Sequence, residues 1–357
     1  MNIRCPLRWN EIGWARLAAA TIAVNAAHGT PVVRAAWARM HAMSAPDRNI
    51  TLLGPQRAQP SVASAVEALG VDGPLCVITA GWQEREGEIE ELAAHCARPV
   101  VDLALYRRTE TLFRRDPGLF DAHRERQNWL RELQRVYRIR LRHTLEAAQD
   151  LLEEDGDPLV LEHERRAAIA ALRTLDRYHL KRIHAAREGF VREQPISAHP
   201  AVAAEREEIA RVIEASAAVL IAGGHVAILV NRMRLLDLAP LIAARPIIAW
   251  SAGAMALTER IVLFHDSPPQ GPGDAEVLDE GLGFVRNLVT LPHASQRLHL
   301  HDRIRVALFA RRFSPAACLT FDPGARVSGD GRRWNEISGS YRLTPRGQLS
   351  LARPVAA

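Results

Sequence analysis

The segment PIIAWSAGAMALTE (246–259) places Ser251 between an apolar run and the small residues Ala252, Gly253 and Ala254. This pattern indicates a sharp turn from a strand into a helix, which can expose a serine hydroxyl as a nucleophile. The N–H group of Ala252 would be free in the first turn of that helix and able to donate to an oxyanion. The alternative interpretation is a buried turn in which Ser251 only caps the helix.

Two further segments place groups useful for chemistry at the ends of predicted strands. VLIAGGHVAILV (219–230) ends a strand on a glycine pair, which lets the backbone approach a ligand closely. VTLPHASQR (289–297) places His293 just past another strand, and histidine suits general-base work near neutral pH. Because the carboxyl ends of neighbouring parallel strands converge, we expect Gly224, Ser251 and His293 to meet in one crevice. A single histidine at a strand end is more often structural, so the order of the three segments carries this hypothesis.

The elements that must position these groups are typical of an α/β fold. Short apolar runs rich in β-branched residues alternate with segments of helical spacing over two parts of the chain. This alternation predicts a mostly parallel sheet with helices on both faces. The predicted strands lie in 49–56, 74–84, 98–106, 217–224, 245–253, 287–293 and 317–324.

The interval 107–198 has a different character, since it is dense in Arg and Glu and lacks strand-like runs. Apolar residues at three- and four-residue steps predict two long helices, separated by the helix-breaking EEDGDP (153–158). We expect a long inserted αα-hairpin, and we consider it as a homodimer interface, a protein-partner site or a substrate lid. The tail has Gly-Asp-Gly and Pro-Arg-Gly turns and predicts a C-terminal antiparallel meander. The predicted domains are an N-terminal helical extension (1–45), a core of 46–106 and 199–345, and the hairpin insertion 107–198.

Composition excludes several classes of protein. The chain has 357 residues and a formal net charge of +5, but its basic residues are scattered, which argues against a nucleic-acid partner. Its four cysteines are far apart and indicate neither a zinc cluster nor a disulfide framework. No apolar run has the length of a membrane helix, so no membrane partner is expected. We expect a cytoplasmic protein that needs neither a metal nor an organic cofactor.

Three segments resemble motifs of the peptidase E and cyanophycinase group of serine peptidases. The GGN-Q turn of that group is similar to residues 222–226, its GTSAGA elbow to 249–254, and its QHFSQR segment to 292–297. The resemblance is clearest over 217–328 and implies a fold related to class I glutamine amidotransferases.

The resemblance also implies roles for individual residues. Ser251 would be the nucleophile and His293 its base, with the N–H groups of Gly224 and Ala252 forming the oxyanion hole. Arg297 would bind a substrate carboxylate, because a guanidinium can hold a carboxylate with two hydrogen bonds. The substrate-binding residues implied in this way are His225, Gln296 and Arg297.

The sequence departs from the group at the residue that would orient the histidine. The glutamate of the group's D-E-G-T-A segment corresponds to Pro323, so we take the adjacent Asp322 as the first candidate acid and Asp266 as the alternative. Val226 and Pro292 also replace polar residues of the group, which argues against cyanophycin-like substrate recognition.

Two functions follow from these observations. The first is a serine hydrolase that cleaves an amide or isopeptide bond in a small acidic peptide through a Ser251–His293 acyl-enzyme mechanism. The alternative is a catalytically inactive relative that binds a ligand, or binds a protein through its helical insert. A glutaminase-type amidotransferase is disfavoured, because that chemistry uses a cysteine at the elbow and none of the four lies there.

Overall fold

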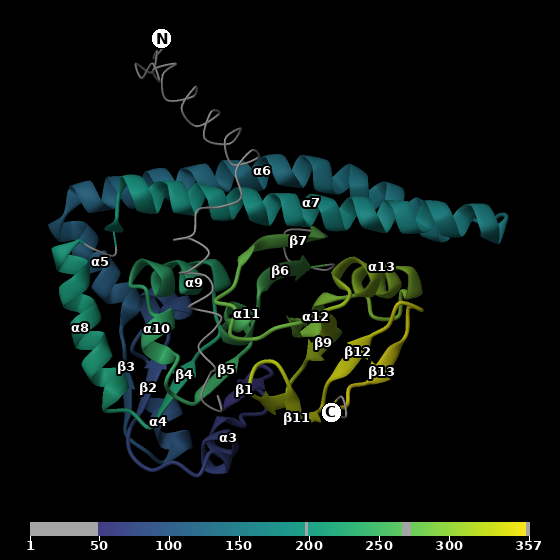
Figure 1. Cartoon of the computed structure of the whole chain (residues 1–357). Coiled ribbons are helices and arrows are strands. Elements are labelled where there is room, and N and C mark those ends of the chain that lie inside the picture. The colour runs from purple at the N-terminus through teal and green to yellow at the C-terminus, as the bar shows by residue number, and fades with distance from the viewer. Residues whose placement is uncertain (1–48, 197–198, 266–272, 355–357) are drawn as a thin grey trace, which may run out of the picture. The chain divides into compact units, whose positions relative to one another are not determined.

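Seven strands form the central sheet. The computed structural model describes residues 49–196, 199–265 and 273–354, so the expected N-terminal helical extension lies outside the described residues. The strand order is β11-β10-β1-β5-β4-β2-β3, in which the five strands from β1 to β3 run parallel (Figure 1). The strands are β1 (Ile50–Leu53), β2 (Leu75–Ile78), β3 (Val100–Asp102), β4 (Ala218–Ile221), β5 (Ile247–Trp250), β10 (Arg326–Gly329) and β11 (Trp334–Ser338). The predicted mostly parallel sheet is confirmed.

Helices cover both faces of this sheet, as the apolar runs predicted. Every residue of β1, β2, β4 and β5 is buried, and alternate residues enter two separate hydrophobic clusters. Leu53 and Ile248 pack with α3 and α4 on one face, while Leu52 and Ala249 pack with α9 and α11 on the other. These helices are α3 (Val62–Ala68), α4 (Glu90–Cys96), α9 (Val226–Leu235) and α11 (Ala252–Leu257).

A second sheet holds two strands that we had expected in the central one. The predicted strands 287–293 and 317–324 are β8 and β9, which pair in parallel but belong to a four-stranded sheet of order β13-β12-β9-β8. The C-terminal antiparallel strands are present, but β10 and β11 join the central sheet whereas β12 and β13 join the second. The new strands are β8 (Leu288–Pro292), β9 (Ala317–Phe321), β12 (Tyr341–Leu343) and β13 (Leu349–Leu351).

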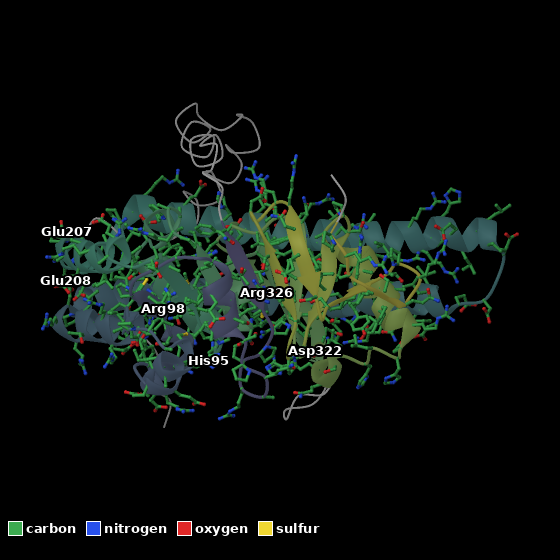
Figure 2. All side chains as sticks on the ribbon, turned by 90° about the horizontal axis from the view of Figure 1, so that it is seen from below. His95, Arg98, Glu207, Glu208, Asp322 and Arg326 are labelled. Atoms are coloured by element: carbon green, nitrogen blue, oxygen red, sulfur yellow. The ribbon has the colours of Figure 1, made fainter. Side chains whose placement is uncertain are left out.

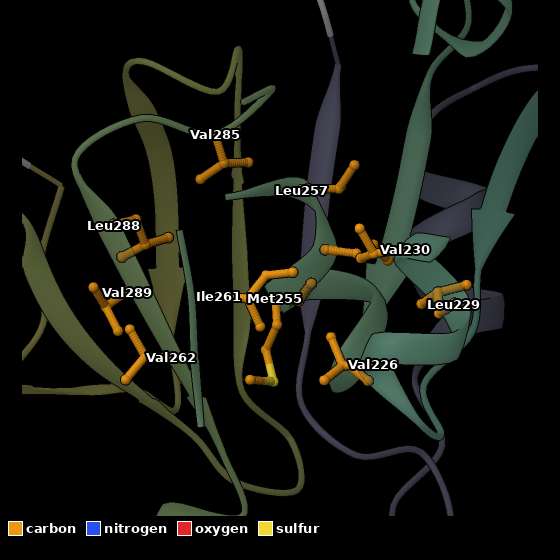
Figure 3. Close-up of a cluster of buried hydrophobic side chains, with 14 of the residues drawn as sticks. Val226, Leu229, Val230, Met255, Leu257, Ile261, Val262, Val285, Leu288 and Val289 are labelled. Atoms are coloured by element: carbon orange, nitrogen blue, oxygen red, sulfur yellow. The ribbon is translucent and has the colours of Figure 1, made fainter. Parts of the chain in front are cut away.

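An antiparallel pair that the sequence did not predict lies between the two sheets. It is formed by β6 (Arg260–His265) and β7 (Gly273–Glu280). Figure 3 shows Ile261 and Val262 of β6 packed among side chains of α9, α11 and β8, including Val230, Met255 and Leu288. This apolar cluster joins the second sheet to the helices behind the first.

Two long helices form the predicted hairpin. They are α6 (Pro117–Glu153) and α7 (Pro158–Glu193), which lie side by side in Figure 1. Each begins with an aspartate cap followed by proline: Asp116 accepts from the N–H of Leu119 at 2.9 Å, and Asp157 from that of Leu159 at 2.8 Å. The hairpin belongs to the confirmed fold, whereas the three domain boundaries stay predictions.

Buried polar groups hold the hairpin against the rest of the protein. Arg312 of α13 donates to both carboxylate oxygens of Asp176 at 2.7 Å and to the Tyr137 hydroxyl at 2.9 Å. Its remaining nitrogen donates to the carbonyl of Ala275 on β7 at 2.6 Å. Because Tyr137 lies on α6 and Asp176 on α7, this one guanidinium joins both hairpin helices to β7.

The remaining helices connect these parts. They are η1 (Ala80–Arg85), α5 (Leu105–Arg115), α8 (Pro200–Glu214), α10 (Ala239–Ile242), α12 (Ala294–Arg297) and α13 (Arg303–Phe313). Among the helices described, none is both long enough and apolar enough to cross a membrane.

Candidate active site

Ser251 follows the last residue of β5 and has an unusual backbone conformation. Its φ of 51° and ψ of −118° fall in a region that residues with a side chain rarely adopt, at a cost of about 1–3 kcal/mol. The Ser251 N–H donates to the carbonyl of Leu53 at 3.2 Å, which ties the turn to β1. Ser251 is the N-cap residue of α11 but makes no side-chain capping hydrogen bond, which does not support the interpretation of its hydroxyl as a simple helix cap.

Small residues are required around this serine. A Cβ atom on Gly223 would lie 3.0 Å from the Ser251 Cβ and 3.3 Å from its Oγ. A Cβ atom on Gly253 would lie 2.2 Å from the carbonyl oxygen of Ile221, which no side chain permits. The small residues in the sequence therefore let the β5–α11 turn pack directly on the end of β4.

The glycine pair forms the second part of the site. Gly224 has a φ of +108°, and a Cβ atom there would lie 2.4 Å from the Gly81 carbonyl oxygen. The same oxygen accepts from the N–H of His225 at 2.8 Å, so the turns after β2 and β4 are in contact. Within the described residues the Gly224 N–H has no recorded acceptor, and the Ala252 N–H lies in the first turn of α11.

His293 follows β8 in a left-handed conformation, with φ 59° and ψ 35°. Its N–H donates to the carbonyl of Phe321 at 3.0 Å, and its side chain is half-buried. Burial and the nearby Arg297 lower the pKa of the imidazole below its ordinary value, while Asp322 acts in the opposite direction. The neutral, proton-accepting form of His293 is therefore favoured at neutral pH.

Backbone contacts through β1 bring the second sheet to the end of the first. Gly54 follows directly on Leu53, the residue bonded to Ser251, and its N–H donates to Ala325 at 2.9 Å. A Cβ atom on Gly54 would lie 2.0 Å from the carbonyl oxygen of Asp322. Asp322 directly follows Phe321, whose carbonyl oxygen accepts the hydrogen bond from the N–H of His293. The β9–β10 loop thus contacts both the strand end beside Ser251 and the turn that carries His293.

Asp322 has a different partner from the one predicted for it. Its Oδ1 accepts from the N–H and the hydroxyl of Ser295, at 3.0 and 2.9 Å (Figure 2 labels Asp322). No hydrogen bond between Asp322 and the His293 ring is recorded in the part of the chain that the structure describes. Asp322 therefore fastens the turn at the start of α12, and its role as the orienting acid stays a prediction. Asp266, the alternative acid, lies outside the described residues.

The predicted substrate-binding residues lie on two turns. The Nδ1 of His225 accepts from the N–H of Ile228 at 3.3 Å, so in the neutral ring the exposed Nε2 carries the proton. Gln296 is exposed, and Arg297 is half-buried, with a pKa that burial lowers. Arg297 makes no ion pair with any residue described, which leaves its guanidinium available to an anion.

The turn after β2 was missed by the sequence reasoning. Gln83 has φ 58° and ψ −119°, nearly the conformation of Ser251. Nothing in its residue type signals such a backbone, and only Gly81 marks the turn in the sequence. The half-buried Gln83 lies two residues from the backbone that contacts Gly224, so it belongs with the candidate site.

The three cysteines that the structure describes are buried and unpaired. Cys76, Cys96 and Cys318 are buried free thiols, and burial raises the pKa of Cys76 to about 11. Across residues 49–196, 199–265 and 273–354, no group of three His, Cys, Asp or Glu side chains is placed to hold a metal ion.

Comparison with protein families gives one match. Residues 193–317 match the model of peptidase family S51, and this match confirms the resemblance to the peptidase E and cyanophycinase serine peptidases. The matched segment runs from the end of α7 to the start of β9 and contains the glycine pair, Ser251 and His293. This match supports a serine peptidase-like hydrolase as the general class of the chain. No curated protein matches the chain.

Proposed function

We propose that this protein is a serine hydrolase that cleaves an amide or isopeptide bond in a small acidic peptide. The observation that carries the proposal is the conformation of Ser251, with its hydroxyl against Gly223 and uninvolved in helix capping. Backbone strain of this kind persists where the surrounding structure enforces it, and it gathers at sites of function. A cytoplasmic location and a homodimeric state remain predictions from the sequence.

The proposed reaction has two steps. His293 takes the proton of the Ser251 hydroxyl as the oxygen attacks the carbonyl carbon, and the N–H groups of Gly224 and Ala252 hold the oxyanion. His293 then gives its proton to the departing amine, which leaves an acyl group on Ser251. In the second step His293 takes a proton from water as the water oxygen attacks the acyl carbon. It then returns this proton to the Ser251 oxygen as the ester bond breaks and the acid leaves.

The acidic character of the substrate is inferred from the groups on the two turns. Arg297 lies four residues beyond His293 and has no carboxylate partner among the described residues. The exposed Nε2 of His225 offers a second donor next to Gly224. A carboxylate on the substrate would be held by these donors, with the guanidinium providing two of the hydrogen bonds.

The test is labelling of the purified protein with a fluorophosphonate, which an activated serine oxygen attacks at phosphorus with loss of fluoride. Wild-type protein is expected to be labelled, while Ser251→Ala and His293→Ala are expected to be unreactive because one lacks the nucleophile and the other its base. A matched control is Ser295→Ala, which removes a neighbouring hydroxyl bonded to Asp322 and is expected to retain labelling. The label is located by mass spectrometry of the digested protein.

The second candidate function is that of an inactive relative that binds a ligand or a protein partner. It is favoured by one observation, namely that no described carboxylate makes a hydrogen bond to the His293 ring. A well-folded wild-type protein that takes up no label, or takes it up equally in Ser251→Ala, would favour this second function over the hydrolase.

The pH dependence of labelling tests the role of His293. The neutral imidazole is the active form, so the labelling rate is highest at high pH and falls as the pH drops through the His293 pKa. Burial and Arg297 lower this pKa, so the midpoint is expected below 6.5, the ordinary value for histidine. Arg297→Gln is expected to raise the midpoint and Asp322→Asn to lower it, because their charges act on the imidazolium in opposite senses.

The control for this profile is Arg142→Gln, a change at an exposed position on α6, which is expected to leave the midpoint in place. A midpoint above 6.5 that Arg297→Gln does not move would show that another group governs the reaction.

A further inference from the structure

Hydrogen bonds between α6 and α7 fix which residues face each other across the hairpin. Tyr137 bonds to Asp176 at 2.7 Å, and Gln134 bonds to His179 at 2.7 Å. About three helical turns farther from the hairpin tip, the same register brings Arg126 of α6 opposite Arg187 of α7. Arg126 therefore occupies a position on the inward-facing side of α6, which elsewhere carries apolar or hydrogen-bonded residues.

Among the residues that the structure describes, Arg126 has no carboxylate partner. Its side chain there contacts the Nδ1 of His123, at 3.1 Å. Burial, together with Arg126 and Arg232, lowers the pKa of His123 to about 3, so this imidazole is neutral and brings no negative charge. Burial and the positive charges of Arg187 and Arg234 lower the pKa of Arg126 itself to about 10.

The neighbouring arginines share a single carboxylate. Arg187 donates to both oxygens of Asp279, and Arg234 donates to the Asp279 Oδ2 at 2.8 Å. Burial alone would raise the pKa of Asp279, but the two guanidiniums lower it, so this carboxylate is fully ionised at neutral pH. The adjacent Glu280 carboxylate lies 3.3 Å from His184, and its negative charge also acts on Arg234. Arg187 and Arg234 thus share the Asp279 carboxylate, whereas Arg126, whose pKa their charges lower, has no carboxylate partner among the described residues.

An excess of positive charge at a partly buried place is costly unless an anion offsets it. The planar guanidinium of arginine suits the oxygen atoms of a carboxylate or phosphate group, which accept its paired N–H donors. We propose that Arg126, together with Arg187 and Arg234, forms a binding site for a small oxyanion, a carboxylate or a phosphate group. This site does not depend on the hydrolase proposed above.

The experiment measures the melting temperature of the full-length protein at pH 7.5 and constant ionic strength, with chloride replaced stepwise by inorganic phosphate or by succinate. A ligand that binds only the folded protein raises the melting temperature, by about 2–4 °C at ten times its dissociation constant. The wild type is expected to show this rise with phosphate, with succinate, or with both. A response to only one of the two anions identifies the chemical class of the natural ligand.

Substitutions assign the response to Arg126. Arg126→Gln and Arg126→Met are expected to abolish the rise in melting temperature that the anion causes. Arg126→Lys keeps the positive charge but lacks the planar guanidinium, and it is expected to weaken the rise. The matched control is Arg124→Gln, an exposed arginine on the same helix turn, which is expected to respond as the wild type does.

In chloride alone, Arg126→Met is expected to melt at or above the wild-type temperature, because it removes the repulsion from Arg187 and Arg234. The proposal is overturned if neither anion raises the wild-type melting temperature. It is also overturned if the rise is the same in wild type, Arg126→Gln and Arg124→Gln.

Discussion

Arg312→Met is expected to lower the free energy of unfolding by about 3–5 kcal/mol at pH 7. The Arg312 side chain is only 1% exposed, and the Asp176 side chain it pairs with is only 3% exposed. Methionine fills a similar volume, but it leaves the Asp176 carboxylate charged and buried beside a Tyr137 hydroxyl that has lost one donor. The free energy of unfolding is measured by urea titration.

Two further variants serve as controls for this prediction. Arg142→Met replaces an exposed arginine of α6 and is expected to change the free energy by no more than about 0.5 kcal/mol. The double variant Arg312→Met with Asp176→Leu is expected to be more stable than Arg312→Met alone, because it leaves no unpaired buried charge. A loss below about 1 kcal/mol in Arg312→Met would mean that the guanidinium does not hold the hairpin in place.

Gly224→Ala is expected to reduce fluorophosphonate labelling of Ser251 by about 100-fold or more, the effect of losing one oxyanion donor. The added Cβ would lie 2.4 Å from the Gly81 carbonyl oxygen and 2.6 Å from its carbon, and both atoms are backbone. The turn must therefore shift, which redirects the Gly224 N–H. The positive φ adds a cost of about 1–3 kcal/mol to the stability of the folded protein.

A matched control separates backbone strain from the loss of the donor. Gly70 also has a positive φ, of +62°, but a Cβ atom there would meet nothing within 4 Å. Gly70→Ala is expected to be somewhat destabilised and to be labelled at the wild-type rate. Wild-type labelling in Gly224→Ala would remove this N–H from the proposed mechanism.

The local features of the site were predictable because they depend on short stretches of sequence. The small residues around Ser251 predicted a tight turn, and its φ and ψ together with the close approach of Gly223 agree with that prediction. The helix-breaking EEDGDP (153–158) was an equally direct signal, since its Asp157 and Pro158 begin the second hairpin helix. Such features need no knowledge of the strand order.

Features that depend on distant partners were not predictable in this way. The apolar runs of β8 and β9 indicated burial, but they carry no information about which sheet a strand joins. The β6–β7 pair was missed because β7 mixes apolar residues such as Val277 with acidic ones such as Glu276 and Asp279. These carboxylates look like surface residues in the sequence, yet they bind arginines of the hairpin and of α9. The left-handed Gln83 has no sequence signal, since its conformation is imposed by its surroundings.

The position of β1 in the central sheet also determines when that sheet can be completed during synthesis on the ribosome. β1 is the first described strand, yet its two neighbours are β5 and β10, and Ile50 pairs with Gly329 about 280 residues later. At synthesis rates of about 5–20 residues per second, roughly 15–55 s pass between these two residues. During this interval the edge of β1 that later binds β10 has no partner strand, while the hairpin helices, whose contacts are local, can already form. A chaperone that covers exposed strands would act on this protein before its C-terminal strands emerge, and production at low temperature would lengthen that exposure.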